Sequence, residues 1–227
     1  MLRAVILTSR RNCVSTGTAL SRRHFKIYTR TGDGGSSMLF NGERRRKDDP
    51  IFSALGDTDE LNAALGVARA QCESVVARSP AVRTLADILP QLDSVQSRLL
   101  DIGSCIATPI NENSSEAKLK QTAFDHKGDL TSQLEAWMDA MDTDLLPLRS
   151  FILPSGGMAS ASFHQARAIC RRAERSVVLL CLNGDCDRSA AVYLNRLSDY
   201  LFVAARFLAK HCGRRDVIYK KSTSTEL

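Results

Sequence analysis

Apolar residues recur at alternating spacings of three and four along most of the chain. The clearest series is Leu85, Ile88, Leu92, Val95, Leu99, Ile102 and Ile106. Similar series run from 159 to 180 and from 194 to 208, and weaker ones lie within 50–76 and 130–145. Such spacing keeps apolar side chains on one side of a helix, as in bundles packed at shallow angles. The pattern therefore predicts an all-α protein, a bundle of five helices.

Turn-forming stretches separate the predicted helices, among them residues 108–122 and 153–157. Within the second stretch, Ser155 is well placed to cap the helix that follows. Residues 26–37 differ in character, because their glycines exclude a helix, and we expect an extended segment before the bundle. We predict one domain over residues 26–219 and a flexible polar tail at 220–227.

The positive charge of the chain is concentrated at its N-terminus. The sequence holds 31 basic and 25 acidic residues, a net charge of +6, but residues 1–25 contain five arginines and no acid. Without them the net charge is +1, which argues against a nucleic-acid-binding surface over the whole fold. An acid-free leader rich in Arg and Ser is typical of a mitochondrial transit peptide, and a disordered basic tail is the alternative. The first interpretation predicts a protein of the mitochondrial matrix.

Several classes of protein are disfavoured by what the 227 residues lack. No apolar run approaches the roughly 18 residues needed to cross a bilayer, so no membrane partner is expected. The seven cysteines are odd in number and show no CxxC spacing, which indicates neither a disulfide framework nor a zinc site. No HExxH motif occurs, and no Glu precedes a His by three residues, so a di-iron bundle is disfavoured. We predict no metal site built directly from side chains.

Arg167, Arg171 and Arg175, the arginine row, are four residues apart and lie beside the apolar side of their predicted helix. Like charges at this spacing repel by about 0.2–0.5 kcal/mol per pair. Glu174 supplies one negative charge, but Arg172 adds a further positive one. A phosphate chain would balance the surplus, because guanidinium groups pair bidentately with phosphate oxygens. A solvated helix face explains the row equally well.

Residues 26–37, the glycine segment, carry the second candidate for anion binding. Consecutive backbone amides without Cβ atoms can surround an anion. The hydroxyl donors beside them are Thr29, Thr31, Ser36 and Ser37. No Gly-Lys-Ser/Thr follows, so the segment is not a Walker A loop, and a plain turn remains the alternative. Lys47, in the charge run 43–49, could reach a phosphate or be solvated.

Asn195 and Asp199 share one face of the last predicted helix. The carboxylate could pair with an arginine of the arginine row or hold a metal-bound water. A structural hydrogen bond between helices explains the same spacing.

Six segments, in chain order, carry a resemblance to a known family. They are residues 29–35, 42–49, 58–62, 151–157, 167–175 and 195–202. Together they resemble the ATP:cob(I)alamin adenosyltransferases of the trimeric helical-bundle type. The resemblance implies a ferritin-like, cobalamin adenosyltransferase-like bundle that moves the 5′-deoxyadenosyl group of ATP to the cobalt of cob(I)alamin, releasing triphosphate. It further implies a homotrimer with ATP between subunits, Mg²⁺ carried by the phosphates, and a methylmalonyl-CoA mutase as acceptor of the product.

The resemblance also assigns roles to residues. ATP is expected to contact Thr29, Arg30, Thr31, Gly32, Ser37, Lys47, Arg171, Glu174, Arg175 and Asn195. Phe151 resembles the aromatic residue at the lower axial face of cobalamin, and Arg167 resembles an arginine that forms an intersubunit salt bridge to the 57–60 region. The expected catalytic residues are Arg171, Asp199 and Phe151. Gly34 stands where the family commonly has lysine, so ATP affinity is expected to be lower or to be supported by Arg30.

The competing hypothesis is a non-catalytic bundle adaptor whose arginine row docks an acidic partner. RNA binding is disfavoured, because no aromatic residues alternate with the arginines for base stacking. ATP should protect an adenosyltransferase, but not the adaptor, against thermal unfolding.

Overall fold

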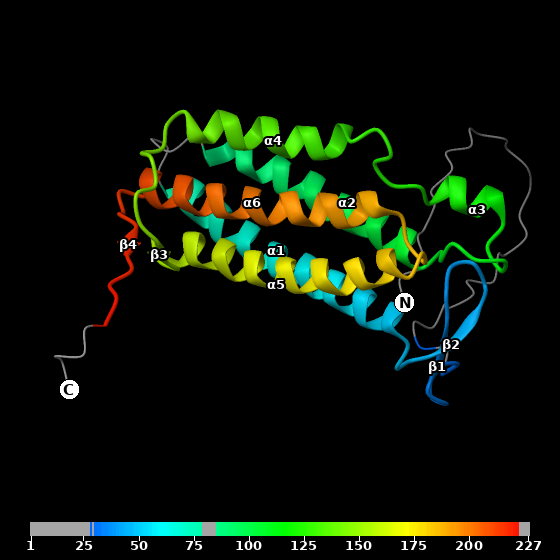
Figure 1. The fold of residues 1–227 in the computed structure, drawn as a ribbon. Coiled ribbons are helices and arrows are strands. Elements are labelled where there is room, and N and C mark those ends of the chain that lie inside the picture. Colours follow the sequence, from blue (N-terminus) through cyan, green and yellow to red (C-terminus); the bar gives the residue numbers. More distant parts are fainter. Residues whose placement is uncertain (1–27, 29, 79–84, 223–227) are drawn as a thin grey trace, which may run out of the picture.

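The computed structural model describes residues 28, 30–78 and 85–222. Its long helices are α1 (Pro50–Arg78), α2 (Ile88–Ile106), α4 (Asp129–Asp142), α5 (Met158–Leu182) and α6 (Arg188–His211). They lie alongside one another (Figure 1); α5 contacts both α1 and α6, and α4 packs on α6. The predicted all-α bundle with five long helices is confirmed. The predicted transit peptide, Thr29 and residues 223–227 lie outside the described residues.

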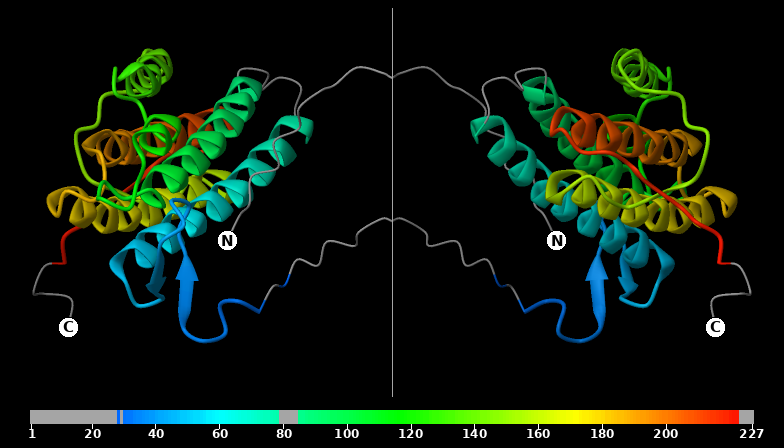
Figure 2. Two further views of the ribbon diagram at one scale, coloured as in Figure 1. Left: turned by 90° about the vertical axis from the view of Figure 1, so that its right-hand side faces the viewer. Right: turned by 90° about the vertical axis from the view of Figure 1, so that its left-hand side faces the viewer.

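The structure adds short elements that the sequence pattern did not indicate. Helix α3 (Glu116–Gln121) lies within the stretch predicted to be a connection. Strand β1 (Ser36–Met38) pairs antiparallel with β2 (Arg44–Arg46), and β3 (Ile152–Leu153) pairs antiparallel with β4 (Val217–Ile218). Figure 2 shows the β1–β2 hairpin beside the first turns of α1. Strands of two or three residues are too short to produce a recognisable alternation of apolar and polar positions.

The core follows the apolar series that defined the helices. Every member of the Leu85–Ile106 series is at most 2% exposed. Burial of each such side chain contributes about 1.5–3 kcal/mol to folding. Two large aromatic side chains of α6 complete the core: the hydroxyl of the buried Tyr200 donates to Gln91 Oε1 at 2.8 Å, and the Tyr193 ring packs edge-to-face on Phe124.

Acidic side chains mark several helix starts. Asp49 Oδ1 accepts a hydrogen bond from the Ile51 amide at 3.0 Å, and proline follows Asp49 at the first position of α1. Asp187 likewise accepts from the Ser189 amide at the start of α6. The prediction that Ser155 caps α5 is wrong, because the residue at the N-cap position of that helix is Gly157. Gly157 has a φ of 94°, which is not a helical conformation. Ser155 Oγ instead accepts a hydrogen bond from the Val217 amide at 3.2 Å.

The described part of the chain contains six cysteines, and none of them is in a disulfide. Among the helices described, none combines the length and apolar character needed to cross a bilayer.

Candidate functional site

Residues 30–35 of the glycine segment form a compact turn before β1. Arg30 adopts the left-handed conformation with φ 57°, and Gly35 has φ 76°. The Asp33 amide donates to the Arg30 carbonyl at 3.4 Å, and the Gly35 amide donates to the Gly32 carbonyl at 3.3 Å. A left-handed backbone conformation is uncommon at arginine, and such conformations cluster at functional sites. Ser37 lies in β1 and is buried. The other residues that were predicted to contact ATP, where the structure describes them, are exposed or partly exposed.

Two cations from the second half of the hairpin lie against this turn. A Cβ placed on Gly32 would lie 3.3 Å from Lys47 Nζ, so the ammonium group sits directly beside that glycine. Arg44 Nη2 donates to the Thr31 carbonyl at 2.8 Å and to Ser36 Oγ at 2.9 Å. The turn therefore carries local positive charge beside its glycines, an arrangement suited to an anion.

Lys47 was predicted from the sequence as a contact of the anion, but Arg44 was not. Arg44 lies in the same charge run, 43–49, and that position could have indicated it. Gly34 stands where the resemblance implies a lysine. A Cβ placed on Gly34 would have no neighbouring atom within 4 Å. Packing therefore does not explain the loss of that lysine.

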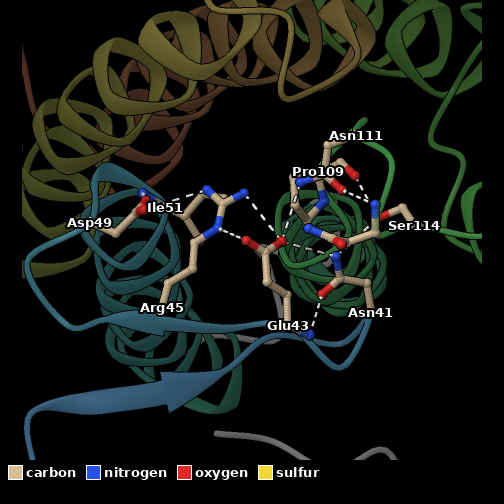
Figure 3. A network of polar contacts seen from close by, with 9 residues as sticks. Asn41, Glu43, Arg45, Asp49, Ile51, Pro109, Asn111 and Ser114 are labelled. Carbon is tan, nitrogen blue, oxygen red and sulfur yellow. Dashed lines mark hydrogen bonds and ion pairs between the residues drawn. The ribbon is translucent and has the colours of Figure 1, made fainter.

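A polar network around Glu43 fixes the hairpin to the body of the protein (Figure 3). Glu43 accepts hydrogen bonds from Arg45 Nε at 2.8 Å and from Asn111 Nδ2 at 3.2 Å. Asn41 Nδ2 donates to Ser114 Oγ at 3.0 Å, which adds a second link to the segment after α2. The hairpin is therefore held by side chains that are distant in sequence.

We expect Glu43→Gln to lower the free energy of unfolding by about 1–2 kcal/mol at pH 7. Hydrogen bonding by Arg45, followed by Asn111 and Asn41, lowers the pKa of Glu43 from 4.5 to about 2. Because the folded-state pKa is depressed, ionised Glu43 stabilises the fold above pH 4.5, and this contribution is lost as the pH falls toward 2. Urea unfolding across this range should show a shallower pH dependence in the variant. An identical pH dependence in both proteins would contradict the network's role.

The same network places the hairpin at one end of α5. The Ile110 amide, in the segment that binds Glu43, donates to the Asp185 carbonyl at 2.9 Å. Asp185 lies in the turn that follows α5. Arg175 is about 10 Å from the end of α5 along its axis, at 1.5 Å per residue. The hairpin therefore lies at the C-terminal end of α5, the end that follows the arginine row.

Arg171 and Arg175 are exposed on α5. Arg175 Nη1 donates to the Arg171 carbonyl at 2.9 Å, and Glu174 Oε1 accepts a hydrogen bond from Asn195 Nδ2 at 2.8 Å. Asn195 thus makes the interhelical hydrogen bond that was one of the alternatives for it. Asp199 lies 3.7 Å from Arg196 Nη1 on its own helix, and the structure does not bring its carboxylate to the arginine row.

Arg172 does not add to the surplus charge, and that expectation is wrong. Its Nε donates to Asp57 Oδ1 at 3.1 Å, and its Nη2 pairs with Glu60. Ser176 Oγ donates to Asp57 Oδ2 at 2.5 Å. Two acids of the 57–60 region are therefore already paired within the chain.

Arg167 is the least satisfied member of the arginine row. Its Nε is buried and has no hydrogen-bond partner among the described residues. The guanidinium carbon lies 5.9 Å from the centre of the Phe202 ring. A buried donor of this kind costs free energy unless it meets an acceptor, so an acceptor from outside the chain would stabilise it.

Phe151 lies at the other end of the bundle, immediately before β3 and the start of α5 (Figure 1). Its side chain is 84% exposed, which is unusual for an aromatic ring of this size. Arg171 is about 20 Å further along the axis of α5. Within one chain, Phe151 and the β1–β2 hairpin therefore lie at opposite ends of the bundle. Among the residues described, no three His, Cys, Asp or Glu side chains are arranged to hold a metal ion.

A helical bundle with a cation-lined glycine turn and a partly unpaired row of arginines has the features of a protein that binds an anion. Comparison with known proteins makes the class specific. A profile of the cobalamin adenosyltransferase family matches residues 27–208, and the chain belongs to this family.

Two curated relatives support the assignment. The chain is 48% identical over 196 residues to the corrinoid adenosyltransferase MMAB of Mus musculus, covering 86% of this chain and 78% of that protein. It is 47% identical over 197 residues to the protein of the same name from Homo sapiens, covering 87% and 74%.

A solved structure supports it as well. A variant of the PduO-type ATP:corrinoid adenosyltransferase from Lactobacillus reuteri, complexed with cobalamin and ATP, superposes with a TM-score of 0.72. It is 30% identical and covers 86% of this chain and all of that one.

Proposed function

We propose that the protein transfers the 5′-deoxyadenosyl group of ATP to the cobalt of cob(I)alamin, giving adenosylcobalamin and triphosphate. The observation that carries this proposal is the family match, which extends over the glycine turn, the arginine row and Phe151. The cations beside the glycine turn support ATP as the substrate, because a triphosphate carries the complementary charge. A non-catalytic adaptor would not need Lys47 and Arg44 placed beside the glycine turn.

The active assembly that we propose is a homotrimer with ATP bound between neighbouring subunits. Its support is the distribution of groups within one chain, where the glycine segment and Phe151 lie at opposite ends of the bundle. An adjacent subunit would bring a glycine segment of one chain to the arginine row of another. The unpartnered Arg167 fits a position at this interface. Because Asp57 and Glu60 already bind Arg172, the exposed Asp59 is the acid of that region left to receive Arg167.

The nucleotide contacts fall into two groups. From the glycine segment and hairpin we assign Thr29, Arg30, Thr31, Gly32, Ser37 and Lys47, of which Thr29 lies outside the described residues. From the bundle we assign Arg171, Glu174, Arg175 and Asn195. The hydrogen bond between Glu174 and Asn195 would present their remaining polar atoms together where α5 and α6 pack against each other. Asp199, one helical turn beyond Asn195, would act through bound water rather than through the arginines.

The reaction follows from the properties of the substrates. Cobalt in cob(I)alamin supplies the electron pair that forms the cobalt–carbon bond, and the bond from the 5′ carbon to the triphosphate oxygen breaks with its pair on oxygen. Alignment of the two centres contributes several kcal/mol to lowering the barrier. Arg171, Arg175 and Lys47 would stabilise the charge that develops on the departing triphosphate. Mg²⁺ bound to the phosphates would neutralise part of that charge.

The location and the recipient of the product are further parts of the proposal. The relatives from Mus musculus and Homo sapiens are eukaryotic corrinoid adenosyltransferases. Together with the acid-free, arginine-rich leader, they support a protein of the mitochondrial matrix. A methylmalonyl-CoA mutase would then accept adenosylcobalamin there.

ATP at about 100 times its dissociation constant should stabilise the folded protein by about 2.7 kcal/mol. For a chain of this size the midpoint of thermal unfolding should rise by about 5–10 °C. Calorimetry with ATP, and with adenosine as the control that lacks phosphates, measures the effect. Equal midpoints with and without ATP would support the adaptor, whereas an anaerobic assay that yields adenosylcobalamin establishes the enzyme.

A further inference from the structure

The two-stranded ribbon β3–β4 carries Phe151 and is very small. It has two paired positions, Ile152 with Ile218 and Leu153 with Val217. One further hydrogen bond, from the Tyr219 amide to the Phe151 carbonyl at 2.8 Å, holds the backbone of Phe151 itself. A ribbon of this size is not stable alone, so its position must be set by contacts with the bundle.

Arg206 of α6 makes such a contact with both chain segments that enter the ribbon. Its Nε donates to Asp216 Oδ2 at 3.2 Å, and Asp216 immediately precedes β4. Its Nη2 donates to the Leu146 carbonyl at 2.7 Å, in the loop that leads to Phe151. Arg206 is only 8% exposed, and a buried guanidinium is tolerated only when its hydrogen bonds are made. These two acceptors bind two of its N–H donors.

The next turn of α6 holds the same loop. Lys210 Nζ binds the carbonyl oxygen of Asp144 and, at 2.5 Å, its carboxylate. The other carboxylate oxygen lies 3.3 Å from His211 Nε2. The loop 144–146 is therefore fixed at two points to one face of α6, while Phe151 itself projects into solvent.

The chain after β3 also packs closely on α6. A Cβ placed on Gly156 would lie 2.5 Å from the Cβ of Ala209. This close approach fixes the distance between α6 and the chain that leaves the ribbon. The position of the Phe151 ring is therefore determined by backbone that α6 holds, since the ring has little packing of its own.

We propose that Arg206 is a positioning residue for Phe151, which sets the height of the ring against the lower face of the corrin. The inference rests on the proposed function. Phe151 displaces the lower ligand of cobalt only if its ring reaches the metal's axial position, and Arg206 fixes both backbone segments that determine that reach. Arg206 does not touch the substrates.

The test compares Arg206→Met with the wild-type protein. Methionine is unbranched and similar in length, but it makes neither hydrogen bond. ATP affinity should stay within about twofold, and turnover from cob(II)alamin with a chemical reductant should fall about tenfold, since a tenfold change corresponds to about 1.4 kcal/mol of lost positioning. The electron paramagnetic resonance spectrum of bound cob(II)alamin, with ATP present, should show a smaller fraction without a lower ligand. Arg206→Lys should restore part of that fraction.

Arg69→Met is the matched control, because it removes an arginine whose partners, Glu73 and Asp93, belong to α1 and α2 and not to the segments that enter the ribbon. Its spectrum and turnover should equal those of the wild type. If Arg206→Met does not fold, Asp216→Asn is the variant to measure in its place. Asp216 is partly exposed, and in this variant Arg206 keeps its contact with Leu146, so the protein should fold. Amide hydrogen exchange at Tyr219 should accelerate in either variant, a readout that does not depend on activity.

The outcomes separate the two proposals. An active wild type together with an unchanged cob(II)alamin spectrum and unchanged Tyr219 exchange in the variants overturns the role of Arg206. A wild type that forms no adenosylcobalamin from ATP and cob(I)alamin overturns the proposed function, and the positioning of a corrin by Arg206 fails with it.

Discussion

Arg171→Ala should lose most adenosyltransferase activity, about 10²-fold or more in kcat/KM, while the protein stays folded and keeps the oligomeric state of the wild type. The side chain of Arg171 is exposed and makes no hydrogen bond or ion pair with another described residue, although Arg175 donates to its backbone carbonyl. Its removal should therefore change the free energy of unfolding by no more than about 0.5 kcal/mol. If Arg171 donates to the leaving triphosphate as proposed, its loss should lower the rate by about 10²- to 10³-fold. Steady-state kinetics with chemically reduced cobalamin, together with light scattering, measures both parts.

The matched control for Arg171 is its neighbour Arg172. The Arg172→Ala protein loses the contacts with Asp57 and Glu60, so its unfolding midpoint should fall while saturation with ATP is retained. The two variants should thus show opposite patterns, one kinetic and one structural. Unchanged turnover in Arg171→Ala would reject the phosphate role.

The helices could be predicted from the sequence because amphipathic spacing is a local property. The Leu85–Ile106 series and its counterparts identified five helices before any contact between them was known. Helix α3 had no such series, and it has no buried residue of its own. It is supported partly by Lys118, whose ammonium binds the carbonyl oxygens of Phe40 and Asn41. Contacts over such a distance in sequence leave no local pattern.

The candidate site was predictable as a set of residues but not as a pattern of pairing. Arg171 and Arg172 are adjacent in sequence and look equivalent, yet successive helical residues point about 100° apart. Only Arg172 faces the acids of α1, and this depends on which helix lies beside α5. Arg206 was missed for a related reason. Its signal was a lone charge between Ala205 and Phe207 within a buried stretch of α6, which indicates a paired side chain but not its partners.

Phe151→Ala should bind ATP normally and should be slow with cob(II)alamin under reducing conditions. The ring is 84% exposed in the isolated chain, so its removal should leave folding almost unchanged. In the reacting complex the ring would pack against the lower face of the corrin, a contact worth about 1.5–3 kcal/mol. If this contact is made only when the lower ligand has left, turnover should fall about 10- to 150-fold. The rate with preformed cob(I)alamin should fall less, since that state needs no further reduction.

Leu182→Ala is the control for Phe151→Ala, because Leu182 is 80% exposed at the far end of α5. It removes a comparable exposed apolar side chain and should leave both rates unchanged. The ratio of the cob(II)alamin rate to the cob(I)alamin rate is the decisive measurement, because a general loss of binding would lower both rates together. Full activity of Phe151→Ala with cob(II)alamin would refute the assignment to the lower face. A fall in the ratio places the ring where reduction of cobalt is made easier, the step for which an exposed phenylalanine on a ribbon held by α6 is suited.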